Sequence, residues 1–363
     1  MIGRTLFGYI AIRFTKTVAA MMISLLLLIV VIDFVEQLRK ASELSDVTLW
    51  SLLQLSMLKA PVFLDKAFPF GCLFAAMITL TQLNLKMELV VARAAGVSAW
   101  QFLMPVSAAA IIIGLFAAFI YNPLAVTSFE KSKEVEVRIF DRSARQTNAE
   151  VSGYWMKQEE HDGSSIINAR IARNKGTILD DVKIIRFDPE GHIIERIDAE
   201  TAVYSGVSWV LTNSVVTRES EVAERKDTLI VPTNLTRDIL AGVTASADSI
   251  PVWELRQMAG KATLAGGNPN PYLVQFHGLL ALPVFLVAMV MIAATVTLRF
   301  VRFGQIGRLI LGGILSGFVL YTVTKLVTSL GSNGIVPPFV AAWSPSVVAI
   351  LFGTSILLHQ EDG

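Results

Sequence analysis

A long hydrophilic insert divides the chain into two sets of three apolar runs, and this layout restricts the fold more than any other feature. A membrane span needs ~20 mostly apolar residues, because only a closed hydrogen-bonded helix satisfies its backbone in lipid. The sequence therefore predicts three spans in residues 1–121, an inserted domain over residues 122–272 and three spans in residues 273–363. The six runs are Thr17–Val35, Val62–Leu83, Phe102–Tyr121, Leu273–Leu298, Leu309–Leu330 and Phe339–Leu358.

Composition agrees with a membrane protein and excludes several kinds of site. Of the 363 residues, 53% are hydrophobic and 17% are charged, whereas an average soluble domain is ~25% charged. The net charge is +1, which does not imply a nucleic-acid partner. The single cysteine, Cys72, excludes an intramolecular disulfide, and the four histidines lack metal-ligand spacing. No metal and no cofactor are therefore expected.

The basic residues predict the orientation of the spans. An even number of spans puts both termini on one side, where the short segments carry eight Lys and Arg residues against three on the other side. The positive-inside rule then places both termini in the cytoplasm and the insert outside. The first run continues to Val35 with no small-residue cleavage site, which indicates an uncleaved span. The eight are Arg4, Arg13, Lys16, Lys86, Arg93, Arg299, Arg302 and Arg308, and the three are Arg39, Lys40 and Lys59.

The insert has the alternating pattern of a β domain. Ser164–Ala172 and Asp181–Phe187 are rich in β-branched residues and predict strands. The turn sequence Asp188–Gly191 joins the second of these to His192–Ile197 as a hairpin, and another glycine turn precedes Trp209. Short strands with frequent turns indicate a sandwich, jelly roll or barrel. Its role stays open between a solvated spacer and an apolar groove for a lipid-like ligand, with edges that can extend another β domain.

The connection between the second and third runs predicts a short helix over about residues 85–97. Its apolar residues have helical spacing, Gly96 is a natural stop, and Ser98 can cap the following span. This helix either lies at the membrane surface without a partner or couples to a groove of a cytoplasmic ATPase. The chain has no G-x-x-x-x-G-K-S/T sequence, so any ATP would be used by another chain. The candidate coupling residues are Glu88, Leu89, Arg93, Ala94 and Gly96.

Five stretches, in order along the whole chain, carry a resemblance to a known family: Asp33–Lys40, Phe68–Phe70, Glu88–Ser98, Asn122–Pro123 and Gly334–Pro338. Together they resemble the LptF/LptG (YjgP/YjgQ) family of lipopolysaccharide export permeases. Glu88–Ser98 is similar to the coupling helix of that family and is the most specific of the five. The phrase F-V-E-Q-L-R-K within the first stretch looks closer to the LptG branch than to the LptF branch.

The resemblance implies a system that the residues alone do not show. Such a chain would be the transport subunit, not an enzyme, in the inner membrane of a Gram-negative bacterium. It would pair with an LptF-like permease and be driven by a cytoplasmic LptB-like ATPase dimer. Lipopolysaccharide would enter from the outer leaflet between the two permeases and pass into a periplasmic β-jellyroll, then to LptC-like and LptA-like jellyroll proteins.

Lipopolysaccharide carries phosphates and acyl chains, so its cavity needs basic residues at headgroup level and apolar walls below. The basic candidates are Arg39, Lys40, Lys66, Lys131, Lys133 and Lys325, and the apolar candidates are Phe63, Phe68, Phe70, Phe74, Phe318 and Tyr321. The alternatives are snorkelling for the basic side chains and ordinary packing or lipid contact for the aromatic ones. Lys325 lies inside a span, which favours a cavity or a partner. Asp33 departs from the basic residue that LptG chains tend to carry around this position, so it is expected to pair with a lysine of this or the partner subunit rather than to contact phosphate.

Other readings stay open at this point. Gly313 and Gly317 have a spacing that permits close helix approach, either at a heterodimer seam or in internal packing. The chain could instead serve another lipid or lipoprotein ABC system, or act as a non-catalytic scaffold. A membrane-embedded lipid-modifying enzyme would need a nucleophile–base arrangement, and the acidic residues Asp33, Glu36, Glu43 and Asp46 have no histidine beside them.

Overall fold

The computed structural model describes residues 4–42, 47–94, 96–140, 151–160, 163–174, 176–218, 222–233, 235, 240, 247–264, 267–297 and 306–361. The chain divides into two compact units, which are described separately below. The helical unit comprises Met1–Glu136 and Leu273–Gly363, and the β unit comprises Val137–Tyr272.

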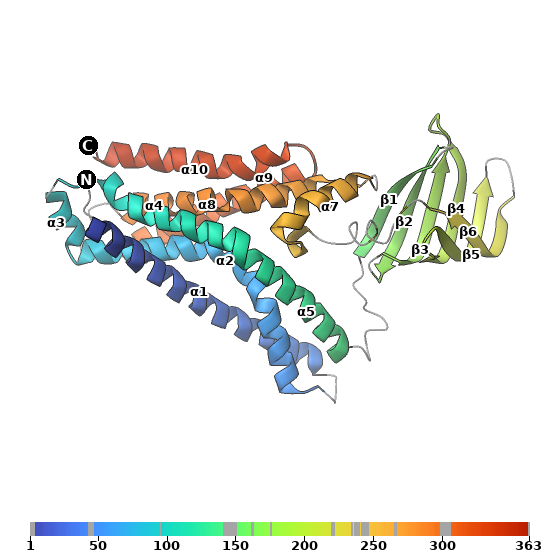
Figure 1. The fold of residues 1–363 in the computed structure, drawn as a ribbon, viewed down its shortest axis with the longest axis horizontal. Coiled ribbons are helices and arrows are strands. Elements are labelled where there is room, and N and C mark those ends of the chain that lie inside the picture. The colour runs from blue at the N-terminus through green and yellow to red at the C-terminus, as the bar shows by residue number, and fades with distance from the viewer. Residues whose placement is uncertain are drawn as a thin grey trace. The chain divides into compact units, whose positions relative to one another are not determined.

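The helical unit consists of long, mostly apolar helices and two short helical elements. They are α1 (Arg4–Ala41), α2 (Leu49–Leu85), α3 (Glu88–Ala94), α4 (Ala99–Phe116), the π turn η1 (Ala117–Tyr121), α5 (Asn122–Phe140), α8 (Asn270–Thr297), α9 (Ile306–Ser332) and α10 (Pro338–Glu361). Across the described ranges, six helical segments are long and apolar enough to cross a membrane, and they correspond in order to the six expected runs. Figure 1 shows both chain termini and α3 at one end of this unit, here called the termini-side end. The opposite end, where α5 leads toward the β unit, is called the insert-side end.

The helices extend well beyond the apolar runs. The apolar run predicts the second span from Val62, whereas α2 begins at Leu49 and spans 37 residues. At ~1.5 Å per residue this is about 56 Å, against ~30 Å of hydrocarbon. Lys59, which was expected in a short connection, therefore lies inside α2. The third span likewise continues through η1 and α5 to Phe140, and the division of the units at Glu136 groups most of α5 with the helices rather than with the insert.

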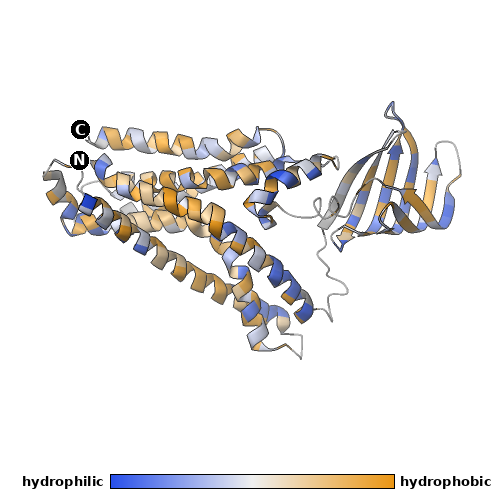
Figure 2. Cartoon of the chain, in the orientation of Figure 1, coloured by the Kyte–Doolittle hydropathy of each residue, from blue (hydrophilic) through white to orange (hydrophobic). Residues whose placement is uncertain are grey.

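The π turn η1 lies just before Pro123. Proline has no N–H to donate and its ring collides with the carbonyl four residues earlier, so a straight helix cannot pass through it unchanged. The chain widens instead: the N–H of Asn122 donates to the carbonyl of Ala117, five residues back. A single wide turn of this kind lets the helix continue past the proline. Figure 2 shows that α5 becomes hydrophilic toward its end.

Glycines and small residues allow close helix contacts. A Cβ at Gly114 of α4 would lie 2.5 Å from the Cα of Pro283 in α8, so these two helices touch backbone to backbone. A Cβ at Gly313 or Gly317 of α9 would collide with Met77 or Leu73 of α2. The Gly313/Gly317 spacing therefore serves packing within this chain.

The β unit contains a six-stranded antiparallel sheet in the order β1-β2-β3-β4-β5-β6, so every strand pairs with its neighbours in sequence. The strands are β1 (Val151–Glu160), β2 (Gly163–Arg173), β3 (Ile178–Phe187), β4 (Ile193–Tyr204), β5 (Ser208–Arg218) and β6 (Glu224–Pro232). The sheet is curved (Figure 1). After β6 come the 3-10 turn η2 (Ala247–Ser249) and α7 (Val252–Leu264). The expected fold class, six spans with an inserted all-β domain, is confirmed.

Alternate side chains of the strands bury one face of the sheet. The largest fully buried side chain is Trp209, whose ring lies 5.5 Å from that of Tyr204. The predicted turn after β3 is present: the N–H of Gly191 donates to the carbonyl of Asp188, and Gly191 has a φ of 89°. The second glycine turn is also present, at Gly206, where φ is 103°. Both turns use backbone conformations that favour glycine.

Candidate functional site

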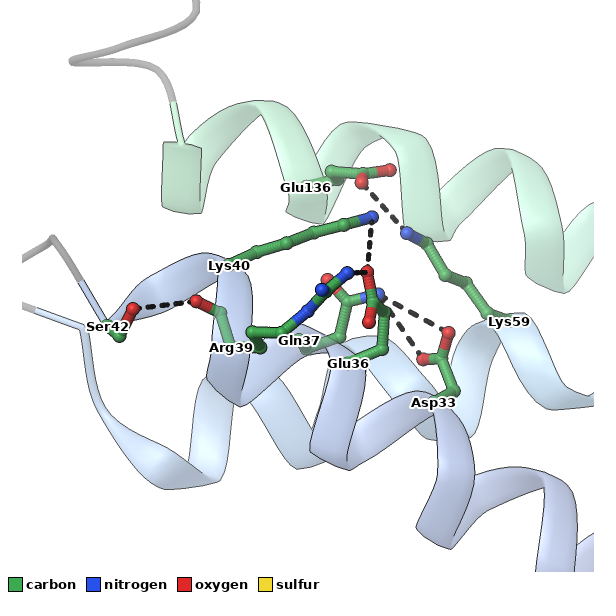
Figure 3. A network of polar contacts seen from close by, with 8 residues as sticks. All are labelled: Asp33, Glu36, Gln37, Arg39, Lys40, Ser42, Lys59 and Glu136. Atoms are coloured by element: carbon green, nitrogen blue, oxygen red, sulfur yellow. Dashed lines mark hydrogen bonds and ion pairs between the residues drawn. The ribbon is translucent and has the colours of Figure 1, made fainter.

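A polar network lies at the insert-side end of the helical unit (Figure 3). In the last turns of α1, Arg39 and Lys40 both contact the Glu36 carboxylate, at 2.8 Å and 3.9 Å. These pairs are exposed and lie within one helix, so they add little stability and leave the cations accessible. Asp33 accepts a hydrogen bond from the side-chain amide of Gln37 at 3.3 Å, and its expected pairing with a lysine of this or a partner subunit stays a prediction.

An ion pair between α2 and α5 is the least exposed ion pair of this network. The Lys59 ammonium lies 2.8 Å from the Glu136 carboxylate, and the two side chains are 10% and 37% exposed. Lys59 and Glu136 are 77 positions apart in the sequence, so no local pattern predicts the contact. The pair holds the outer part of α5 against α2 at the last residue of the helical unit before the β unit begins.

An aromatic stripe runs along one face of α2. Phe63, Lys66, Phe70 and Phe74 recur at helical spacing, so they share this face. The ring of Phe70 lies 4.9 Å from that of Tyr321 on α9. Phe63 is 46% exposed, while Phe70 and Phe74 are half-buried. Phe68 lies on the other side of α2, is 6% exposed and packs edge-on against Tyr121. The structure therefore separates Phe68 from the expected apolar wall and assigns it to internal packing.

The matching stripe on α9 carries Phe318, Tyr321 and Lys325, three and four positions apart and so on one face. Phe318 is 58% exposed. The Lys325 ammonium lies 5.6 Å from the centre of the Tyr321 ring, a cation–π distance. We call the two stripes together the α2–α9 face: Phe63, Lys66, Phe70, Phe74, Phe318, Tyr321 and Lys325. It combines aromatic rings with two basic residues on the outside of the unit.

Lys131 and Lys133 of α5 do not converge. Both are exposed, but residues two apart on a helix point to different sides. The Lys133 ammonium lies 4.9 Å from the centre of the Phe129 ring on its own helix. These two residues therefore cannot hold one phosphate together.

At the termini-side end, α3 is shorter than expected. The helix covers Glu88–Ala94 rather than residues 85–97, because α2 continues to Leu85 and Met87 adopts a left-handed φ of 59°. The predicted Gly96 stop is present with φ 82°, and the Ser98 hydroxyl caps α4 by accepting from the N–H of Gln101 at 3.4 Å.

Two of the five coupling candidates hold α3 in place within this chain. The Glu88 carboxylate pairs with Arg13 of α1 at 3.3 Å, and the Tyr9 hydroxyl donates to it at 3.4 Å. Leu89 is 3% exposed in the helical core. The Glu88 side chain is 34% exposed, so its carboxylate is held by α1 and still reachable from outside, whereas Leu89 packs inward. The coupling roles expected for these two residues stay predictions.

The outer face of α3 carries Val91 and Ala94. Val91 is 68% exposed, and Ala94 and Gly96 are also exposed. The backbone of Arg93 is helical, while its side chain lies outside the described part of the chain. Val91 was not among the expected coupling residues, because the apolar residues with helical spacing in this stretch are Leu85, Leu89, Val90 and Ala92. The signal for Val91 is its position two residues from Leu89, on the opposite side of the helix.

Comparison with known proteins extends over nearly the whole chain. Residues 8–359 match the family model described as lipopolysaccharide export system permease LptF/LptG. The chain is 24% identical over 376 residues to the lipopolysaccharide export system permease protein LptG of Haemophilus influenzae, covering 99% of both chains. It is also 24% identical over 369 residues to the protein of the same name from Escherichia coli, covering 99% of this chain and 97% of the relative.

Proposed function

Because the chain belongs to the lipopolysaccharide export system permease family LptF/LptG, we propose that it extracts lipopolysaccharide from the outer leaflet of the inner membrane. In this proposal it pairs with an LptF-like permease and passes the lipid to its own periplasmic β unit, then to LptC-like and LptA-like bridge proteins. A separate LptB-like ATPase dimer supplies the energy. The observation that carries the proposal is the α2–α9 face, where Phe70, Tyr321 and Lys325 combine apolar surface with positive charge.

The chemistry of this face suits an amphipathic, phosphorylated lipid. Acyl chains pack against exposed aromatic rings such as Phe318, which is 58% exposed. Lys66 and Lys325 offer ammonium groups to phosphates, and such charges in membrane segments usually face a cavity or a partner. Arg39 and Lys40 add exposed cations at the insert-side end. The lipid would then move along the face toward the β unit.

Coupling to the ATPase is proposed for the outer face of α3, with Val91 as the apolar anchor and Ala94 and Gly96 allowing close approach. Glu88 and Leu89 fix α3 to α1 and to the core, so a push on α3 reaches the spans. ATP shifts the population of states only if the ATPase binds α3 differently in its two nucleotide states.

Photo-crosslinking tests the lipid path. A photoreactive phenylalanine at Phe70 or Phe318 should capture lipopolysaccharide in native membranes, and the same group at the buried Phe68 should not. Phe68 is a matched control because it lies two residues from Phe70 on the opposite side of the same helix. Capture at Phe68 but at neither face position would contradict the proposed path.

Purification from native membranes tests the partners. A P-loop ATPase and a second six-span homologue should accompany the protein. Val91→Glu should remove the ATPase and keep the homologue, because a buried charge on the anchor is costly. Gly96→Asn should also weaken recovery of the ATPase and keep the homologue, because asparagine tolerates the left-handed φ of 82° but its side chain blocks close approach. Recovery of the protein alone, with lipid and no ATPase, would sink the transporter proposal.

A further inference from the structure

Helix α7 has two apolar faces, of which only one is covered by protein. Val252, Leu255, Ala259 and Ala262 form the covered face, with exposed fractions between 0% and 5%. On the opposite face Trp253 is 58% exposed and Leu264 is 80% exposed. Two large apolar side chains with such high exposure on one short helix indicate that the helix contacts an apolar or interfacial environment.

Trp253 and Leu264 lie on one line along α7. They are 11 positions apart, about three helical turns, and the exposed Gln257 and Gly260 lie between them on the same line. A Cβ at Gly260 would meet nothing within 4 Å, so the line is open along its length. We call Trp253, Gly260 and Leu264 the open stripe of α7.

Basic residues border the open stripe on both sides. Arg256, three positions after Trp253, is exposed on one side, and Lys261, three positions before Leu264, is partly exposed on the other. Aromatic and aliphatic residues flanked by Lys and Arg are typical of helices that lie in the membrane interface, where the basic groups reach lipid phosphates.

The chain tethers α7 to a membrane span. The N–H of Gly267 donates to the carbonyl of Ala262 at 2.8 Å, so the connection folds back onto the end of the helix. Only three Cα steps, at most ~11 Å, then separate Gly267 from Asn270, where α8 begins.

The start of α8 has the features of a membrane boundary. The rings of Phe276 and His277 are 5.4 Å apart, and the His277 ring lies 5.6 Å from Phe339 at the start of α10. Phe339 in turn lies 5.8 Å from Trp343. Aromatic residues gathered at span ends mark the headgroup level. Because only a few residues join α7 to α8, the length of the chain limits how far Leu264, at the C-terminal end of α7, can lie from this level.

We propose that α7 is an interfacial helix that lays its open stripe on the phospholipid headgroup layer, on the side of the membrane that holds the β unit. The occupant is lipid rather than protein because the stripe combines tryptophan with flanking cations at the level of a span boundary. The role of α7 would be to anchor the C-terminal end of the β unit at the bilayer surface. This inference needs only that α8 crosses the membrane, so it stands or falls independently of lipopolysaccharide transport.

Because the single cysteine is buried, an introduced cysteine can be labelled specifically for a fluorescence test. Cys72 is fully buried, so an environment-sensitive maleimide dye attaches to an introduced cysteine, and the unchanged chain gives the blank. The full-length protein is labelled as Leu264→Cys or, as the matched control, Glu254→Cys, an exposed position of α7 off the stripe. Both are reconstituted in vesicles of phosphatidylethanolamine and phosphatidylglycerol.

The dye at Leu264 should emit further to the blue, be quenched by brominated lipids and be shielded from aqueous iodide, whereas the dye at Glu254 should show the reverse. Adding Gly260→Asp, which has room for its side chain, should reduce lipid quenching at Leu264 severalfold. Equal iodide quenching at both positions would overturn the proposal. Shielding from iodide without lipid quenching would overturn it too, because a protein then covers the stripe.

Discussion

The contact between Lys59 and Glu136 shows how one ion pair can link two long helices. Its members differ in burial, with Lys59 10% and Glu136 37% exposed. A charge that loses its partner in a buried place costs more free energy than one that water can reach. Mutation of Lys59 and mutation of Glu136 are therefore expected to change the free energy of unfolding by different amounts.

We expect Glu136→Gln to destabilise the protein more than Lys59→Met. The first change strands a buried ammonium, and the second leaves a carboxylate that solvent screens. The free energy of unfolding should fall by about 1–3 kcal/mol for Glu136→Gln and by about half of that or less for Lys59→Met. Thermal unfolding in detergent measures both, and the double variant should resemble Lys59→Met. Equal losses would contradict the asymmetry.

Gly114 joins the two halves of the helical unit by backbone contact with Pro283. Gly114→Ala adds a methyl group 2.5 Å from a Cα atom that cannot rotate away. The free energy of unfolding should fall by about 1–3 kcal/mol.

The control for Gly114 is Gly278→Ala in α8, where a Cβ meets nothing within 4 Å. It should be neutral or stabilise by up to about 1 kcal/mol, since alanine is the better helix former. Gly114→Ala should lower the melting temperature, whereas Gly278→Ala should leave it unchanged or raise it. A loss of the same size in both would mean that the close approach is not what matters.

Among the elements, α3 depends on a contact outside itself, because a helix of seven residues is too short to be stable alone. The Arg13–Glu88 pair supplies that contact. Charge reversal at either residue should weaken the recovery of the ATPase, because α3 is no longer held against α1. Arg13→Glu combined with Glu88→Arg should restore much of it.

Recovery of the ATPase with each single and with the double variant measures this coupling. The interaction energy should be about 0.5–1 kcal/mol, as for other partly exposed pairs. If the double variant is as poor as the worse single variant, the two residues act independently and the contact does not position α3.

The hairpin between β3 and β4 is sensitive to acid. The pKa of the Asp188 carboxyl is lowered from its ordinary 3.8, first because the N–H of His192 donates to it and then because of the His192 side chain. A lowered carboxyl pKa contributes stability that is full above the unfolded pKa and is lost as the pH falls through the folded pKa. This contribution therefore disappears below about pH 3.8.

Asp188→Asn removes the charge and keeps an acceptor for the turn. The variant should melt below the unchanged protein at about pH 6, and the gap should narrow as the pH falls below the ordinary carboxyl pKa of 3.8. Melting temperatures of the full-length protein across this range measure it. A gap that persists unchanged in acid would show that the carboxylate charge does not stabilise the turn.

For the whole molecule, sequence patterns predicted what is local and repetitive. Six apolar runs, the alternating strands and the turns at Gly191 and Gly206 are confirmed by the structure. The family match over residues 8–359 confirms the family, and the similarity to two LptG proteins agrees with the LptG branch.

What sequence could not predict depends on contacts between distant residues. Arg13 and Glu88 are 75 positions apart, so no local pattern predicts that Glu88 also ties α3 to α1. Phe68 and Phe70 look alike in the sequence, and only the neighbouring Tyr121 and Tyr321 tell them apart. The cytoplasmic position of the termini, the partners and the lipid contacts stay predictions.

The uninterrupted helix from Ala99 to Phe140 has a mechanical consequence. It runs for 42 residues, about 63 Å at ~1.5 Å per residue, or roughly twice the hydrocarbon thickness. In a helix of this length, a small tilt of α4 near the termini displaces Phe140, at the other end, by a much larger distance. The π turn before Pro123 is the one wide turn in this helix. The stiffness of this turn decides how much of a tilt of α4 reaches α5 and how much is taken up by bending.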